Sequence, residues 1–160
     1  MTLIEYLNST EITNETRQFN KELLKKYPWL NVKRFNTNIT EEEENDFTWL
    51  DDMPRGWRIA FGDQICEDID KALKKHNFEN NYYIMQIKEK FGTLRWYDCS
   101  KPKELYEEMN NIIFKYEDLS EHTCIECGKP ATKMSIGWIS PYCDNCIGTM
   151  KYTEIERDTE

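Results

Sequence analysis

Residues 122–148 read HTCIECGKPATKMSIGWISPYCDNCIG and contain four of the six cysteines in this chain of 160 residues. The four form two CxxC pairs separated by fifteen residues: Cys124, Cys127, Cys143 and Cys146. This spacing is typical of four-cysteine zinc sites, because each pair can make a tight turn that points both sulfurs at one ion. Gly128, directly after the first pair, suits the positive φ that such a turn needs. We therefore predict a zinc ribbon over residues 121–150.

Zinc is the cofactor that this pattern favours, with one ion per chain. Four thiolates leave no open coordination position, so the metal is expected to be structural rather than catalytic. Iron remains an alternative, because a tetrahedral thiolate site accepts either metal. Two disulfides are a further alternative, although they are rare in intracellular proteins. A module of about 30 residues has little core of its own, so we expect chelation to unfold it.

The composition indicates a globular protein of the cytoplasm. Hydrophobic residues make up 39% of the chain and charged residues 32%, which is typical of folded domains. No apolar run approaches the 18 or so residues that a membrane helix needs. The first fifteen residues lack the basic and apolar regions of a signal peptide. We therefore expect no association with membranes.

The net charge of −9 disfavours one class of function. A strongly acidic protein repels phosphate backbones, so general coating of nucleic acids is not expected. The charge is uneven, however, because residues 54–103 carry ten basic and seven acidic side chains. Only this middle segment could present a basic surface.

The N-terminal third, residues 1–47, is predicted to be a helical segment followed by an acidic loop. Phe19, Leu23 and Leu24 recur at helical spacing, Thr13 or Asn14 can cap the helix, and Pro28 ends it. Residues 35–47 combine turn formers with four consecutive glutamates and are typical of a solvated loop.

Residues 48–120 predict a helix–hairpin–helix core. In the first helix an apolar stripe recurs every four residues, at Trp57, Phe61, Ile65, Ile69 and Leu73. Gly62 interrupts this helix at a cost of about 1 kcal/mol relative to alanine, so we expect another backbone to pass close to it. The second helix, over residues 103–119, has its own stripe: Leu105, Met109, Ile112, Ile113 and Tyr116.

Between the two helices, the alternating pattern of residues 82–98 predicts a hairpin that turns at Gly92. Strict alternation places one set of side chains on the buried face: Tyr83, Met85, Ile87, Leu94 and Trp96. Tyr82 and Ile84 would then lie on the opposite face. The expected fold is thus α+β, with the zinc ribbon docked on the core through Met134 and Trp138 and with a flexible tail over residues 151–160.

Three motifs resemble those of small uncharacterised proteins encoded by phages and prophages: LDDMPRGWRIAFGDQICEDID, QIKEKFGTLRWYD and KYEDLSEHTCIECGKPATKMSIGWISPYCDNC. The resemblance covers residues 49–146. It implies an accessory protein of a mobile element in a bacterial cytoplasm, and it carries no known activity or functional residue.

The function that we expect is non-enzymatic binding of a protein partner. Side chains that mix positive charge with aromatic character form protein interfaces and also contact nucleic acids. The middle segment offers such a set: Arg55, Arg58, Lys88, Lys90, Arg95 and Tyr97. The simpler interpretation is that the nearby aromatics are core and the cations surround it. A nucleic-acid-binding zinc ribbon is an alternative, although Lys129 and Lys133 are the only cations between its cysteine pairs.

A metal-dependent nucleotide or phosphoester enzyme is a further alternative. Asp63, Glu67 and Asp70 could share a helix face and hold a divalent cation, but an ordinary solvated acidic face opposite the apolar stripe is the favoured explanation. His122 could support the metal site or simply end a helix. The two remaining cysteines, Cys66 within the stripe of the first helix and Cys99 after the hairpin, are expected to be reduced, inert thiols.

Overall fold

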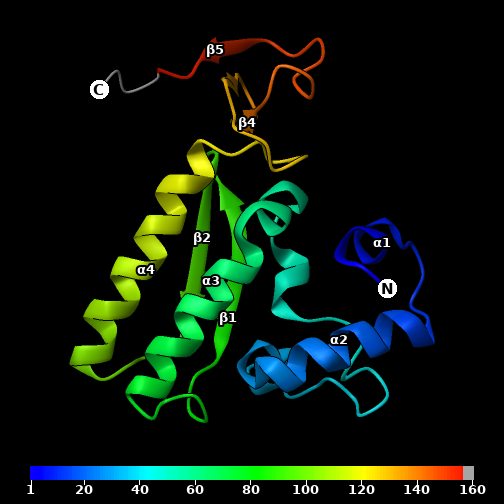
Figure 1. Cartoon of the computed structure of the whole chain (residues 1–160), viewed down its shortest axis with the longest axis vertical. Helices are drawn as coiled ribbons and strands as arrows, with labels where there is room; N and C mark the ends of the chain where they lie inside the picture. The colour runs from blue at the N-terminus through cyan, green and yellow to red at the C-terminus, as the bar shows by residue number, and fades with distance from the viewer. Residues whose placement is uncertain (157–160) are drawn as a thin grey trace.

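The computed structural model describes residues 1–156 and has an α+β architecture (Figure 1). Its central layer is an antiparallel hairpin, and two long helices pack against one face of it. The bounds of these elements are α3 Arg55–Lys75, β1 Ile84–Lys90, β2 Thr93–Asp98 and α4 Lys103–Glu121. The helix–hairpin–helix order predicted from the periodicities is confirmed.

Two helices precede this core, α1 Leu3–Asn8 and α2 Asn14–Lys26, followed by short 3-10 turns at Pro28–Leu30, Val32–Arg34 and Trp49–Asp52. The C-terminal module contributes a small sheet in the order β4 Pro141–Tyr142, β3 Lys133–Ser135, β5 Tyr152–Glu154. In Figure 1 this module caps the end of the molecule where the hairpin turns and α4 ends.

The stripe predicted for α3 is its buried face. All five of its side chains are at most 2% exposed, and they pack with the stripe of α4 in one apolar cluster. Pro54 precedes the first turn of α3, and Lys74 and Lys75 occupy its last turn, where the helix dipole favours cations.

The N-terminal segment contributes to the same core. Trp29 is fully buried and packs edge-on against Tyr82, with ring centroids 5.6 Å apart. Its indole Nε1 donates a hydrogen bond to Asp70 Oδ1 over 3.1 Å. Asp46, at the end of the acidic loop, is also buried and accepts a hydrogen bond from Arg17. The loop is therefore fastened to α2 and is not a free linker.

The face assignment predicted for the first strand is wrong at its beginning. Tyr82 and Ile84 are fully buried, whereas Met85 is exposed. The cause is a β-bulge between Ile84 and Gln86, which adds one residue and shifts the alternation by one position. After the bulge the predicted pattern holds, because Ile87 lies opposite Trp96 and both are buried.

The C-terminal module docks on the first turn of α3. Gly56 N–H donates a 2.7 Å hydrogen bond to the carbonyl of Ile125, and Trp57 Nε1 donates to the carbonyl of Thr123 over 3.0 Å. A Cβ atom at Gly56 would lie 2.1 Å from the carbonyl oxygen of Cys124. The close backbone approach that we expected at Gly62 is therefore at Gly56, since Gly62 faces the side chain of Arg58.

Of the two residues predicted to dock the ribbon on the core, only Met134 does so. Met134 lies against the hairpin turn, since its sulfur would be 3.2 Å from a Cβ atom at Gly92. Trp138 does not dock and is 80% exposed. Part of the predicted tail is ordered, because β5 pairs with β3 along Lys133–Ser135. Residues 157–160 of that tail lie outside the described residues.

Replacing Gly56 by alanine tests the docking contact. The new methyl group would overlap backbone atoms that cannot move independently, so we expect the free energy of unfolding to fall by about 3 kcal/mol. Gly62→Ala in the same helix meets only side-chain atoms and gains helix propensity, so it should change stability by less than about 1 kcal/mol. Urea denaturation of both variants gives the comparison, and equal effects would contradict the docking geometry.

Candidate metal centre

The fold brings the four cysteines of the C-terminal module together. Their Sγ atoms all lie within 4.8 Å of one another, and the sulfurs of Cys127 and Cys143 are 3.6 Å apart. A tetrahedral zinc ion with Zn–S bonds of about 2.3 Å separates its sulfurs by about 3.8 Å. The thiol donor set and its spacing therefore fit one zinc ion with all four positions filled by protein.

Each cysteine pair lies in a hydrogen-bonded turn. In the first turn Cys124 N–H donates to the carbonyl of Lys129 over 2.7 Å, and Gly128 N–H donates to the carbonyl of Cys124 over 3.0 Å. Gly128 has a φ of 79°, which confirms the reason for a glycine at this position. In the second turn Cys146 N–H donates to the carbonyl of Cys143 over 3.2 Å.

The local environment favours the thiolate of Cys143 only, because burial raises the pKa of the Cys127 thiol and that of the Cys146 thiol. Burial opposes loss of the Cys143 proton, but hydrogen bonds from the Cys146 thiol and backbone and from Cys127 outweigh it and lower the pKa of Cys143 to about 7. A thiolate is the form that binds a metal. The site thus supplies a ligand in the right state near neutral pH.

The metal centre is closed by the core on one side. Cys124 is fully buried, and a Cβ atom at Gly128 would lie 2.6 Å from the carbonyl oxygen of Gly56. No coordination position faces an open cavity in this arrangement, because four sulfurs already complete the tetrahedron. The geometry therefore suits a structural metal.

His122 and the other two cysteines do not join this cluster. His122 is exposed, ends α4, and its Nδ1 lies 3.1 Å from the carbonyl oxygen of Asp118. Cys66 is fully buried in the stripe of α3, and burial raises the pKa of its thiol. Cys99 is buried at the end of β2, where its sulfur accepts from the backbone N–H of Tyr83. Both thiols are buried away from solvent.

The acidic residues of α3 do not gather into a cation site. Glu67 pairs with Lys71, while Asp70 accepts from Trp29 and pairs with Lys74. Within residues 1–156, the four-cysteine cluster is the one grouping of histidine, cysteine and carboxylate side chains that is close enough to hold a metal ion.

The predicted binding residues separate into two groups. Arg58 is not on the surface, since its side chain is 2% exposed, pairs with Asp51 at 2.8 Å and lies over the ring of Tyr6. Arg55 is half-buried at the start of α3. The other four share the outer face of the hairpin, where Lys88 lies opposite Arg95, Lys90 opposite Thr93 and Tyr97 opposite Gln86.

One of the two cations between the cysteine pairs, Lys133, forms ion pairs within the ribbon. Lys133 pairs with Asp144 and lies 3.8 Å from Glu154, so it is neutralised by carboxylates of its own module. A hydrogen bond from Lys133 to Asp144 raises the pKa of the lysine, which keeps the lysine charged. A phosphate-binding role for the ribbon gains no support from these contacts.

An aromatic surface that we did not predict lies where the ribbon meets the hairpin turn. Phe91 is 71% exposed in the two-residue turn between β1 and β2. Together with Gly137, Trp138 and Ile139 of the loop at residues 136–139, it borders a small cavity of about 230 Å³. We call Phe91 and the loop Ile136–Ile139 the aromatic tip. Only the place of Phe91 in the predicted turn pointed to this surface in the sequence, because the approach of the loop to the turn depends on the tertiary fold.

Two further observations are not confined to this site. Comparisons with models of protein families, with curated proteins and with solved structures find no match. Among residues 1–156, none of the helices combines the length and the apolarity that crossing a bilayer requires.

Metal analysis of purified variants tests the centre. We expect one zinc ion per chain, and we expect Cys143→Ala to abolish it because three thiolates in an open site hold the ion far less tightly. Cys66→Ala is the control, since it also removes a buried thiol but lies outside the cluster. Full zinc content in Cys143→Ala would contradict the assignment of the metal to the four-cysteine cluster. Iron in the purified wild-type protein would identify iron, rather than zinc, as the metal of this cluster.

Proposed function

We propose that the protein is a non-enzymatic binding protein that contacts a protein partner through the aromatic tip, and that its zinc centre holds this surface in place. The motif resemblance described above supports an accessory role for a mobile element in a bacterial cytoplasm. The observation that carries the proposal is the conformation and exposure of Phe91.

Phe91 occupies a position that its own side chain disfavours. Its φ is 53° and that of Gly92 is 82°, the two positive values that a type I′ hairpin turn requires. Asparagine or glycine suits the first position, whereas a bulky residue there is strained by about 1 kcal/mol or more. The phenyl ring is exposed, so it gains little burial to offset this strain. Phe91 therefore lowers the stability of the fold without a compensating contact in the core, and this supports a role for its side chain in binding.

The neighbouring loop adds to the same surface. The indole of Trp138 is 80% exposed, and the loop that carries it is closed by hydrogen bonds between Ser135 and Ser140. Tryptophan is among the residues most enriched in interface hot spots. A fixed loop loses little conformational entropy on binding. This combination favours a rigid aromatic contact.

The charges beside the tip favour an acidic partner surface. The outer face of the hairpin presents Lys88 and Arg95 as direct neighbours, and Lys90 lies over the ring of Phe91 at 5.7 Å. An apolar centre with cations at its rim complements an apolar side chain flanked by carboxylates. The tip therefore suits a protein with that pattern.

The variant Phe91→Asn separates binding from folding. Asparagine relieves the turn strain, so we expect the free energy of unfolding to rise by about 1 kcal/mol. We expect the partner to be lost at the same time, most completely in combination with Trp138→Ala. The stability is measured by urea denaturation, and the partner by quantitative affinity capture from bacterial cells with wild-type protein for comparison.

Phe114→Ala is the matched control, because Phe114 is 64% exposed on α4, away from the tip. A partner enriched at least about tenfold by the wild type and the control, but not by the tip variant, supports the proposal. Equal capture by all three proteins contradicts it. Capture of nucleic acid with a steep salt dependence would instead favour the alternative of phosphate recognition.

A further inference from the structure

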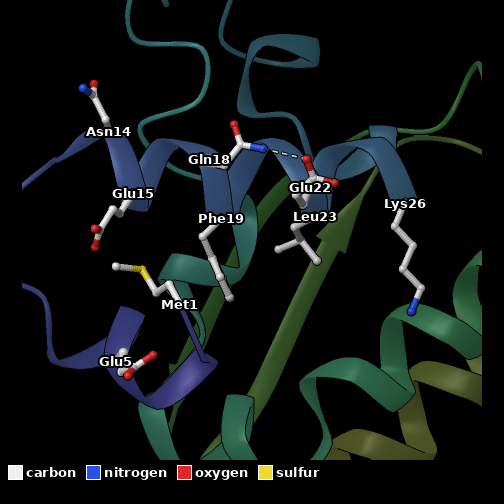
Figure 2. Close-up of a pocket in the computed structure, with 9 residues that line it drawn as sticks. All are labelled: Met1, Glu5, Asn14, Glu15, Gln18, Phe19, Glu22, Leu23 and Lys26. Atoms are coloured by element: carbon white, nitrogen blue, oxygen red, sulfur yellow. Dashed lines mark hydrogen bonds between the residues drawn. The ribbon is translucent and has the colours of Figure 1, made fainter.

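A second surface, distant in the chain from the aromatic tip, lies between α1 and α2. The two helices border an open groove of about 1040 Å³ (Figure 2). Phe19 and Leu23 project from α2 toward this space, and Met1 lies across from Phe19. The lining residues of α2 run from Asn14 to Lys26, which at about 1.5 Å per residue gives a length of about 18 Å. The groove therefore has the size of three turns of a helix.

The edges of the groove are acidic. Three carboxylates line it, Glu5 on α1 and Glu15 and Glu22 on α2, against the ammonium groups of Lys26 and of the Met1 N-terminus. Glu22 also pairs with Lys25 at 2.8 Å. A hydrogen bond from the backbone of Thr2 lowers the pKa of Glu5, and a hydrogen bond from Lys25 lowers that of Glu22. These two side chains are thus charged at neutral pH. The groove combines an apolar floor with a negative rim.

The acidic character continues onto α3. Contact with Tyr27 is the main cause that raises the pKa of Lys26, and the exposed carboxylates of Asp63 and Glu67 raise it further. Two carboxylates of α3 therefore act on the cation at this end of the groove. A ligand with positive charge on both sides of an apolar stripe complements this arrangement.

The wall formed by α1 is held by few contacts. None of its six residues is buried. Its main attachment is Tyr6, whose ring stacks on Phe19 at 4.6 Å and whose hydroxyl donates to Asp51 Oδ1 over 2.8 Å. Asn20 Nδ2 also donates to this hydroxyl over 3.0 Å, and the guanidinium of Arg58 lies over the ring at 5.1 Å. Tyr6 therefore fixes the α1 wall of the groove against α2 and α3.

We propose that the groove between α1 and α2 binds an amphipathic helix of a protein partner, one that presents lysine or arginine side chains beside an apolar stripe. Phe19 and Leu23 receive the apolar stripe, as in other complexes in which a helix lies in a groove. Glu5, Glu15 and Glu22 receive the basic side chains. The site is separate from the aromatic tip and does not depend on it.

A fluorescent amphipathic peptide of leucine and lysine tests this proposal, with a leucine–glutamate peptide of the same pattern for comparison. We expect the basic peptide to bind the full chain and the acidic peptide not to bind. Reversing the charges in Glu15→Lys/Glu22→Lys should weaken binding of the basic peptide about tenfold or more. Circular dichroism establishes that the variant is folded.

The control for charge alone is Glu104→Lys/Glu107→Lys, which makes the same change in net charge at exposed positions of α4, one of them also in the first turn of its helix. This control should bind the basic peptide within about twofold of the wild type. Equal weakening in both variants would show only general attraction and would overturn the proposal. No binding at a peptide concentration of about 1 mM would also overturn it.

The position of the bound peptide is read from amide shifts in NMR spectra. We expect the largest changes in α1 and α2, and the same affinity in the variant Phe91→Asn/Trp138→Ala. Changes centred on the hairpin turn and the loop Ile136–Ile139 would overturn the groove as the site while leaving the aromatic tip in place as an interface.

Discussion

The contact between the first cysteine turn and the first turn of α3 is the constraint on which the arrangement of the molecule depends. Gly56 and Gly128 face one another so closely that a Cβ atom on either would overlap the backbone of the other segment. This approach lets Gly56 N–H reach the carbonyl of Ile125. Only residues without side chains permit such a contact. The turn that orders two metal ligands is thereby joined to the central helix of the core.

The magnitudes indicate that a metal bound here affects the whole chain. Structural zinc binds peptide sites with apparent free energies of about 10 to 16 kcal/mol at neutral pH, whereas a whole domain is stable by about 5 to 15 kcal/mol. Coordination is therefore comparable with the entire stability of the fold. Because Trp57 also donates to Thr123 in the module, loosening of the cysteine turns would disturb the end of the core. The same coupling would fix the loop of Trp138 beside Phe91.

Much of the fold follows from local patterns in the sequence. The four-residue repeat from Trp57 to Leu73 defines the buried face of α3, and the spacing of the cysteines defines the metal cluster. These features are predictable because each depends on residues near one another in the chain. The hairpin was predictable only in part, since the bulge after Ile84 reverses the alternation, and nothing in the period-two pattern marks the extra residue.

The errors arose where distant segments meet. A glycine inside a helix indicates a close backbone contact, and we expected that contact at Gly62. It is at Gly56 instead, because the tertiary fold places the backbone of Cys124 and Ile125 against Gly56. Arg58 was expected on the surface, yet the carboxylate of Asp51 and the ring of Tyr6 compensate its burial. Trp138 was expected to dock, but its neighbour Ile139 makes the contact with the hairpin turn at Gly92, and Trp138 is exposed. The exposed aromatic tip and the groove beside α1 are likewise properties of the tertiary structure.

Hydrogen–deuterium exchange before and after removal of the metal tests most directly whether the cysteine module and the helical core form one cooperative unit. We predict that chelation accelerates exchange both in the cysteine module and in amides of the core. Within the core, the first amides affected should be those in the first turn of α3 and in the hairpin near Gly92. Faster exchange confined to residues 121–156, with the protection of α3 unchanged, would contradict it. The module would then be an independent appendage, and the Gly56–Gly128 contact would not transmit its stability to the core.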